Sequence, residues 1–251
     1  MPRIAKTIIP RIRRSLRERG LVKSLSRSLL LPLHLLREYR SARDLRPDGF
    51  QSEFDYAHGV NTEGELGGWT YLSDLEIASP NWIEGNDYAA IEPERFNQVL
   101  GSLQIEFEEY TFIDFGSGKG RALLLASEFP FKRIIGIEFS TELHRIAGEN
   151  IHRYRSYTQK CMNIECLNID FVDYVLPAEP TVLFFFDPCR MPILEKVLMR
   201  TRQTLCANPR PTTIVYVAPR DEVEELFARA DFLKVVSRST ELKFIVYSNL
   251  P

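Results

Sequence analysis

The feature that most constrains the fold of this chain is a glycine-rich turn between an apolar run and a helix-forming run. Residues 112 to 115 read Phe-Ile-Asp-Phe, glycine follows at positions 116, 118 and 120, and residues 121 to 126 read Arg-Ala-Leu-Leu-Leu-Ala. Glycine lets the backbone turn sharply and lets a ligand approach it closely, while the free N–H groups at a helix start offer donors. The pattern predicts a strand, a tight turn and a helix start that together cradle a ligand.

Strand-type and helix-type patterns alternate after residue 95, which is typical of an α/β sheet. The expected strands cover residues 111–115, 133–138, 162–168, 181–186 and 212–217, and the expected helices cover residues 95–103, 119–128, 141–156, 192–206 and 221–228. Two further β-rich runs, at 232–237 and 242–248, are separated by a short polar link and predict an antiparallel hairpin. With 251 residues, 44% of them hydrophobic, the chain can bury one substantial core.

Acidic residues stand near the ends of three expected strands. Asp114 lies two residues before the first glycine of the turn, which argues against a phosphate ligand and suits a cation. Glu138 follows about twenty residues after the first glycine, where an acid accepts hydrogen bonds from ribose hydroxyls in nucleotide-binding folds. Asp170 follows the third strand, and a solvated turn aspartate is its alternative reading.

The Asp-x-Gly-x-Gly-x-Gly pattern of residues 114 to 120 departs from the dinucleotide fingerprint Gly-x-Gly-x-x-Gly. It resembles motif I of the Rossmann-like, class I S-adenosylmethionine (SAM) methyltransferases. The resemblance implies SAM contacts from Asp114, Gly116, Ser117, Gly118, Gly120, Glu138, Asp170 and Phe171. It also implies a mostly parallel sheet with a reversed strand near its end, whereas dinucleotide-binding domains stay parallel. NAD-dependent reduction is therefore the poorer alternative.

The apolar run from Thr181 to Phe186 predicts a central strand buried on both faces, and Asp187-Pro188 ends it where ligands of open α/β sheets bind. Its position resembles motif IV of amine methyltransferases, which implies that Asp187 contacts SAM and holds the acceptor amine. Asp187-Pro188-Cys189 departs from the Asn-Pro-Pro-Phe and Asp-Pro-Pro-Tyr forms of that motif. The alternative for Asp187 is a strand-end cap.

The segment before the core is acidic and rich in turn residues, which predicts a lid. Together with the core motifs, its pattern Phe-Asp-x-x-x-Gly-Val-x-Thr-x-Gly at residues 54 to 64 resembles a largely uncharacterised family of bacterial class I methyltransferases. That family is distantly related to Rossmann-type protein lysine methyltransferases, and the resemblance covers roughly residues 50 to 250. Tyr88 stands where relatives have a Tyr-x-Pro-Ser/Thr segment that closes over SAM, which implies a lid or catalytic role for it.

Charge divides the chain into three expected units. Residues 1–46 hold thirteen Lys or Arg against three acids, and their Ile and Leu spacing predicts amphipathic helices in a basic arm. Residues 47–94 hold eleven acids and no Lys or Arg, and form the expected lid. Residues 95–251 form the expected SAM-binding domain. The net charge of −2 conceals this division.

Three roles are open for the basic arm. The arm contacts anionic membrane, docks on the acidic segment or, in a eukaryotic source, acts as an organelle presequence. Its longest uncharged run, residues 28 to 36, is too short to span a bilayer. Nucleic acid is disfavoured because no aromatic residues interleave the arginines before Tyr39. The expected location is the cytoplasm, with peripheral membrane contact, or mitochondria if the source is eukaryotic.

The four cysteines and four histidines show no metal-ligand spacing, so no metal is expected. The sequence thus predicts a SAM-dependent methyltransferase that acts on an amine of a protein or small molecule. Its alternative is a SAM-binding adaptor that lost catalysis and works through the basic arm. No motif in the sequence identifies the methyl acceptor.

Overall fold

The structure is a computed structural model that describes residues 52–65 and 68–250. The basic arm of residues 1–46 lies outside the described residues. Its amphipathic helices, its contact with anionic membrane and the locations that follow from it therefore stay predictions. The described helices include none that is both long and apolar enough to cross a membrane.

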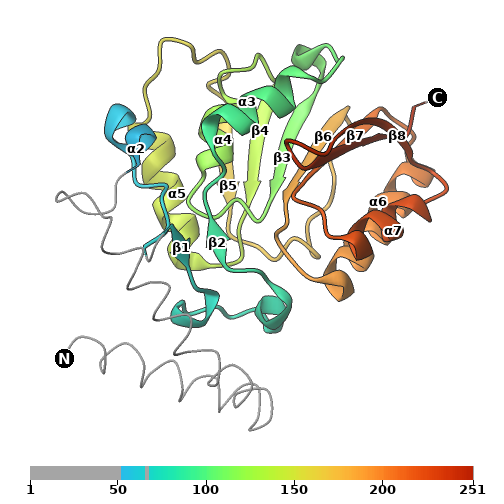
Figure 1. Cartoon of the computed structure of the whole chain (residues 1–251), viewed down its shortest axis with the longest axis horizontal. Helices are drawn as coiled ribbons and strands as arrows, with labels where there is room; N and C mark the ends of the chain where they lie inside the picture. Colours follow the sequence, from blue (N-terminus) through green and yellow to red (C-terminus); the bar gives the residue numbers. More distant parts are fainter. Residues whose placement is uncertain (1–51, 66–67, 251) are drawn as a thin grey trace, which may run out of the picture.

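A seven-stranded sheet forms the centre of the molecule, in the order β5-β4-β3-β6-β7-β9-β8 (Figure 1). Its strands are β3 Thr111–Phe115, β4 Arg133–Ile137, β5 Ile164–Leu167, β6 Thr181–Phe186, β7 Thr212–Val217, β8 Lys234–Ser239 and β9 Phe244–Ser248. Five neighbouring strands run parallel to one another, namely β5, β4, β3, β6 and β7. Strand β9 runs antiparallel to both of its neighbours, β7 and β8. This confirms the expected α/β class with its antiparallel C-terminal hairpin. The reversed strand lies between β7 and β8, so β8 forms the edge.

Helices cover both faces of the sheet. On one face, α3 (Pro93–Gly101) and α4 (Arg121–Ala126) share a core cluster with alternate strand residues, and α5 (Thr141–Arg153) packs beside α4 and β5. On the other face, α6 (Met191–Ala207) and α7 (Asp221–Ala228) cover the remaining strand residues. Because both faces are covered, the central strands carry nearly unbroken apolar runs.

Aromatic side chains fill both cores. Phe112, Phe184 and Phe96 meet on the α3 face, with ring centroids 5.3 to 6.0 Å apart. On the opposite face, the ring of Phe185 stacks on the rings of Phe115 and Tyr216, at 4.7 and 5.7 Å. Such pairs stabilise a core beyond the area they bury. The carboxyl ends of β3 and β6 are therefore held rigidly.

The expected helix at 119–128 is shorter in the structure, because the glycine-rich turn extends further. Gly116, Gly118 and Gly120 have φ values of 85°, 53° and 88°, in the left-handed region that favours glycine. The N–H of Gly120 donates to the carbonyl of Ser117 at 2.8 Å, which closes the turn. Helix α4 therefore begins at Arg121.

The part of the chain before the core, residues 52–65 and 68–92, is here called the pre-core segment. It contains α2 (Glu53–His58), β1 (Trp69–Thr70), η2 (Leu72–Asp74), η3 (Pro80–Glu84) and β2 (Tyr88–Ala89), and one more short turn of helix, η4 (Phe107–Glu109), follows α3. Strands β1 and β2 pair antiparallel. In Figure 1 this segment runs along the sheet beside α4 and α5. The expected boundary at residue 95 falls inside α3.

Replacing Phe184 with alanine should lower the free energy of unfolding by about 3 to 5 kcal/mol, because it removes a fully buried ring from the centre of the sheet. Urea denaturation followed by circular dichroism measures this. The control is Val236→Ala at the exposed bulge of β8, which should change the free energy by less than about 0.5 kcal/mol. Equal losses in both variants would contradict the assigned core.

Candidate functional site

A cavity lies at the carboxyl ends of β3, β4 and β6, where ligands of open α/β sheets bind. The sequence-predicted site residues that line it are Tyr88, Asp114, Gly116, Ser117, Glu138, Phe171 and Asp187. The fold thus brings most of the predicted site together. Gly118, Gly120 and Asp170 do not line the cavity.

Two buried acids, Asp114 and Glu138, face this cavity from neighbouring strands, and each is only 3% exposed. The carboxylate of Glu138 accepts hydrogen bonds from the N–H groups of Gly118 and Ser140, both at 2.8 Å. Among residues 52–65 and 68–250, no donor binds the carboxylate of Asp114. Within this described part of the chain, nothing compensates the burial of this acid.

Burial raises the pKa of Asp114 to about 8, and the nearby Glu138 adds to the shift. Burial also raises the pKa of Glu138 to about 7, although the N–H groups of Ser140 and Gly118 oppose the shift. The two acids interact, so they titrate as a pair. A cation in the cavity would favour the ionised form of both.

Tyr88 lies over the glycine-rich turn. A Cβ atom placed on Gly118 would come within 2.1 Å of the Tyr88 ring, so only glycine permits this contact. The Tyr88 hydroxyl donates to the carbonyl oxygen of Thr62 at 2.5 Å. Burial raises the pKa of Tyr88 above its usual range, which keeps the hydroxyl a donor. Tyr88 thus packs against the turn with its polar end already bonded inside the pre-core segment.

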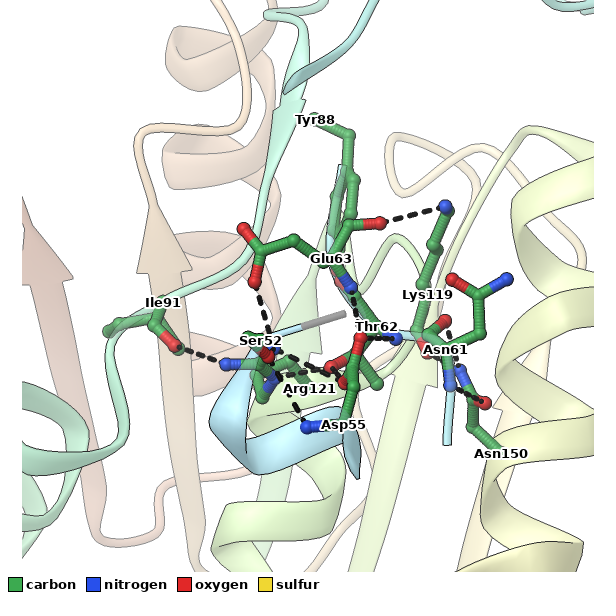
Figure 2. Close-up of polar contacts among 10 residues, drawn as sticks. All are labelled: Ser52, Asp55, Asn61, Thr62, Glu63, Tyr88, Ile91, Lys119, Arg121 and Asn150. Atoms are coloured by element: carbon green, nitrogen blue, oxygen red, sulfur yellow. Dashed lines mark hydrogen bonds and ion pairs between the residues drawn. The ribbon is translucent and has the colours of Figure 1, made fainter. Parts of the chain in front are cut away.

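Arg121, the first residue of α4, is the centre of a buried polar network (Figure 2). It is 3% exposed, and its guanidinium donates to Ser52 Oγ at 2.8 Å, Glu63 Oε2 at 3.2 Å and Asp55 Oδ1 at 3.3 Å. Its Nε donates to the hydroxyl of Thr62. The guanidinium also donates to the Ile91 carbonyl at 3.5 Å. All five partners belong to the pre-core segment, so this arginine ties that segment to the helix that follows the turn.

Asp55 explains much of the pattern at residues 54 to 64. Its carboxylate accepts from the N–H groups of Thr62 and Glu63, at 2.8 and 2.9 Å, and from the Thr62 hydroxyl. The chain can fold back onto Asp55 because Gly59, with φ 64°, ends α2. The resemblance at these residues therefore corresponds to a structural turn, and none of them lines the cavity.

A second set of contacts joins the pre-core segment to the turn through Asn150 of α5 (Figure 2). Its side-chain amide exchanges two hydrogen bonds of 2.8 Å with the backbone of Asn61. The same amide donates to the carbonyl of Lys119, and the buried Lys119 ammonium donates to the carbonyl of Glu63, both at 2.8 Å. Burial lowers the pKa of Lys119. The glycine-rich turn is thus bonded both to α5 and to the pre-core segment.

The other end of the pre-core segment is bonded to the turn after β6. The Asn86 N–H donates to the Pro188 carbonyl at 3.0 Å, and the Arg190 N–H donates to the Glu84 carbonyl at 2.8 Å. The Asn86 side chain also donates to the Asp187 carbonyl at 2.7 Å. The pre-core segment therefore spans the cavity from the glycine-rich turn to Asp187.

Asp187 ends β6 with a φ of 41°, which is uncommon for a residue other than glycine. Its Oδ1 accepts hydrogen bonds from the Tyr216 hydroxyl and from Arg220 Nη2, both at 3.1 Å. Burial raises the pKa of Asp187, and Arg220 and Tyr216 oppose the shift. The side chain is therefore held by two donors where Asp187 lines the cavity.

Asp170 binds the pre-core segment instead of lining the cavity. Its Oδ2 accepts from the Ser79 hydroxyl at 2.5 Å and from the Asn81 amide at 2.8 Å, and its Oδ1 accepts from the Val172 N–H at 3.0 Å. The neighbouring Phe171 does line the cavity. The SAM contact that the resemblance implies for Asp170 stays a prediction.

Nothing in the described part of the chain forms a metal site, because no three His, Cys, Asp or Glu side chains gather closely enough. The cysteines at 161, 166, 189 and 206 are free. Burial raises the pKa of both Cys166 and Cys189 to about 12, so these two thiols are poor nucleophiles at neutral pH.

Sequence reasoning assigned no role to Arg121, Tyr216 or Arg220. A signal existed for Arg121, since a cation in the first turn of a helix opposes the helix dipole and calls for dedicated acidic partners. Tyr216 sits inside an apolar strand, and its hydroxyl gives no sign of a partner in the sequence. Arg220 precedes α7 without any motif of its own.

The sheet order, the reversed β9 and the buried acids beside a glycine-rich turn are those of a class I methyltransferase. Residues 84–179 match the family model described as "Histone methylation protein DOT1". The match includes Tyr88, the glycine-rich turn and Glu138, and it ends before β6 and Asp187. No curated protein sequence matches the chain.

The fold is also similar to many solved structures. A methyltransferase from Pseudomonas syringae is 12% identical, with a TM-score of 0.44 over 62% of this chain and 95% of the other. A SAM-dependent methyltransferase from Aquifex aeolicus is 17% identical, with a TM-score of 0.45 over 64% of this chain and 100% of the other. The glycopeptide N-methyltransferase MtfA, solved with SAM, is 8% identical, with a TM-score of 0.46 over 64% and 94%.

The protein is a class I SAM-dependent methyltransferase, and SAM is its cofactor. The chemistry of the cavity lining suits that cofactor, because SAM carries an ammonium and a sulfonium, and Asp114 offers a buried carboxylate without a donor from the described chain. A Cβ atom placed on Gly116 would lie 2.8 Å from the Pro188 ring, so a residue with a side chain does not fit at this position. Asp114, Glu138 and the glycine-rich turn are the residues expected to hold SAM.

Replacing Asp55 with alanine should lower the free energy of unfolding by about 3 kcal/mol or more, because it leaves the buried Arg121 guanidinium short of a carboxylate. Urea denaturation measures the loss. The control is Glu149→Ala, which breaks only the exposed pairs with Arg145 and Arg153 and should cost less than about 0.5 kcal/mol. A loss as small as the control's would show that the network is not required.

Binding of S-adenosylhomocysteine, which keeps the ammonium, should tighten as pH rises through 7 to 8 and then level off. The ammonium requires an ionised Asp114, and two pH units below its pKa of about 8 only about a hundredth of that group is ionised. Calorimetry should therefore find binding at least about tenfold weaker at pH 6 than at pH 8.5. In Glu138→Gln the dependence should move to lower pH, because Glu138 no longer raises the pKa of Asp114, whereas the exposed control Glu165→Gln should leave it unchanged. A flat profile in the unmodified protein would contradict the assignment.

Proposed function

We propose that this methyltransferase transfers the methyl group of SAM to an amine of a protein or small molecule. The observation that carries the proposal is the placement of Asp187. Asp187 lines the cavity beside the predicted cofactor residues, and one of its carboxylate oxygens, Oδ1, is already bonded to Tyr216 and Arg220. The other oxygen, Oδ2, has no donor within the described part of the chain, and a carboxylate oxygen can only accept from a donor.

An amine supplies an N–H group from which Oδ2 accepts a hydrogen bond. The nitrogen lone pair attacks the methyl carbon of SAM, the carbon–sulfur bond breaks, and its electron pair stays on a sulfur that leaves neutral. The nitrogen then loses a proton, to Asp187 or to water. The protein contributes orientation and exclusion of water, and Asp187 aligns the nitrogen.

The description of the matched family names a histone, which is a basic protein, and this supports an amine in a protein as the first acceptor to test. The family match ends before Asp187, however, so the acceptor side of the site is argued from this chain alone. Tyr88 is the second proposed site residue. Because its hydroxyl is bonded to Thr62, we assign it to covering the glycine-rich turn.

The test is incubation of the full chain with methyl-labelled SAM and a dialysed cell lysate, with polyamines added in a parallel sample. Mass spectrometry should find label on nitrogen. Label on oxygen or carbon would overturn the amine assignment. Absence of transfer together with intact SAM binding would favour the adaptor alternative.

Asp187→Asn should reduce methyl transfer about 100-fold, the scale for loss of one acid–base group, while SAM affinity changes little. Asparagine tolerates the left-handed backbone of this position, so the fold should persist. The matched control is Asp173→Asn, at an exposed aspartate outside the cavity, which should keep full activity. Equal activity in both variants would remove Asp187 from the reaction.

A further inference from the structure

Two side chains far from the glycine-rich turn converge on Asp187. Tyr216 in β7 is fully buried, with its ring stacked on Phe185 at 5.7 Å and edge-on to Phe227 at 5.8 Å. Its hydroxyl is held in place by this packing and donates to Asp187 Oδ1 at 3.1 Å. A buried hydroxyl from the sheet core thus reaches the carboxylate of Asp187.

Arg220 approaches the same carboxylate from the loop before α7. Its Nη2 donates to Asp187 Oδ1 at 3.1 Å and to the Cys189 carbonyl at 2.9 Å. Its Nη1 donates to Glu222 Oε1 at 2.9 Å. The guanidinium is therefore fixed between three acceptors, and its side chain remains 37% exposed.

The two donors meet at one oxygen. Oδ1 receives both hydrogen bonds, whereas Oδ2 receives none from residues 52–65 or 68–250. The carboxylate is therefore anchored at one oxygen, which leaves the other as the acceptor available to the cavity that Asp187 lines. An anchored carboxylate loses the rotamer freedom that a solvated one would have.

The backbone supports the same arrangement. Asp187 and Ala218, at the ends of the paired strands β6 and β7, have φ values of 41° and 57°, and each precedes a proline. Such values in residues other than glycine persist only where the surroundings hold them, and they cluster at functional sites. The strand end that carries Asp187 and the strand end that leads to Arg220 therefore turn in the same unusual way.

We propose that Tyr216 and Arg220 are positioning residues for methyl transfer, which hold Oδ1 of Asp187 so that Oδ2 is presented to an N–H of the acceptor. The proposal rests on the proposed function and makes it more specific. A carboxylate fixed in this way selects acceptors that donate a hydrogen bond or carry positive charge. It disfavours acceptors that are themselves carboxylates or phosphates.

The charged and titratable groups around Asp187 are few. Tyr216 faces it from β7, Arg220 and Glu222 face it from the start of α7, and Cys189 follows it in the same turn. Burial favours the protonated carboxyl, and Glu222 adds to this, while Arg220 and Tyr216 favour the ionised form. Loss of Arg220 should therefore raise the pKa of Asp187.

The first test follows the Asp187 carboxyl by NMR in the full chain with 13C-labelled aspartate, the signal being assigned by its absence in Asp187→Asn. In Arg220→Gln the titration midpoint of Asp187 should move to higher pH, and in Tyr216→Phe it should move in the same direction by less. The matched control is Arg190→Gln, which removes the same charge from an exposed arginine of the same turn. A midpoint in Arg220→Gln that moves no more than in Arg190→Gln would overturn the proposal.

The second test measures methyl transfer against pH, with the acceptor found by labelling. Arg220→Gln should lower the rate about tenfold at neutral pH and move the acid limb of the profile upward, because Asp187 then ionises at higher pH. Arg220→Lys should restore part of the rate and of the limb. A loss of rate that is equal at every pH, with the Asp187 midpoint unchanged, would mean that Arg220 acts only on the fold.

The two tests separate this proposal from the proposed function. If the midpoint moves as expected but label appears on oxygen or carbon, the amine assignment fails and the positioning of Asp187 stands. If amines are labelled and Arg220→Gln behaves like Arg190→Gln, the positioning roles fail and the amine assignment stands. If Arg220→Gln does not fold, Tyr216→Phe and Arg220→Lys give the same decision.

Discussion

The interaction on which the rest of the site depends is the buried ion pair between Arg121 and Asp55. Removing a guanidinium and a carboxylate from water is costly, so such a pair is stable only when nearly every donor and acceptor is satisfied. Ser52, Thr62 and Glu63 complete that requirement. The consequence is positional: the pre-core segment cannot leave the glycine-rich turn at this point without exposing a buried charge to an incomplete set of partners.

Buried charge is treated in two opposite ways within this small region. Around Arg121 the protein supplies every partner, which is what a structural ion pair needs. At Asp114 the protein supplies no donor within the described residues, although the side chain is equally buried. An acid left in this way destabilises the isolated protein and is stabilised by a cation, so the contrast distinguishes the supporting network from the binding site.

The sequence predicts the centre of the sheet well because the central strands are buried on both faces and must be continuously apolar, as in β6 and β7. It also places Asp114, Glu138 and Asp187 together, since the carboxyl ends of parallel strands share one edge of the sheet. It does not reveal contacts that join distant positions through side-chain direction. Arg121 and Asp55 are 66 residues apart, and Tyr216 reaches Asp187 across 29 residues from inside a strand.

The direction of Asp170 shows the same limit. Its place after β5 is the one that the motif predicts, yet whether its carboxylate turns to the cavity or to Ser79 depends on how the pre-core segment packs. Local pattern determines which residues stand at a strand end. Packing by a segment 89 to 91 residues earlier determines where the oxygens of Asp170 point.

The hydrogen bonds between residues 84–86 and 187–190 have a mechanical consequence. The segment that carries Tyr88 over the glycine-rich turn is the same one that binds the backbone of Asp187. A displacement of Tyr88 away from the turn would therefore strain the hydrogen bonds that hold Asn86 to the backbone of Asp187 and Pro188. Movement of this one segment would alter both ends of the cavity together.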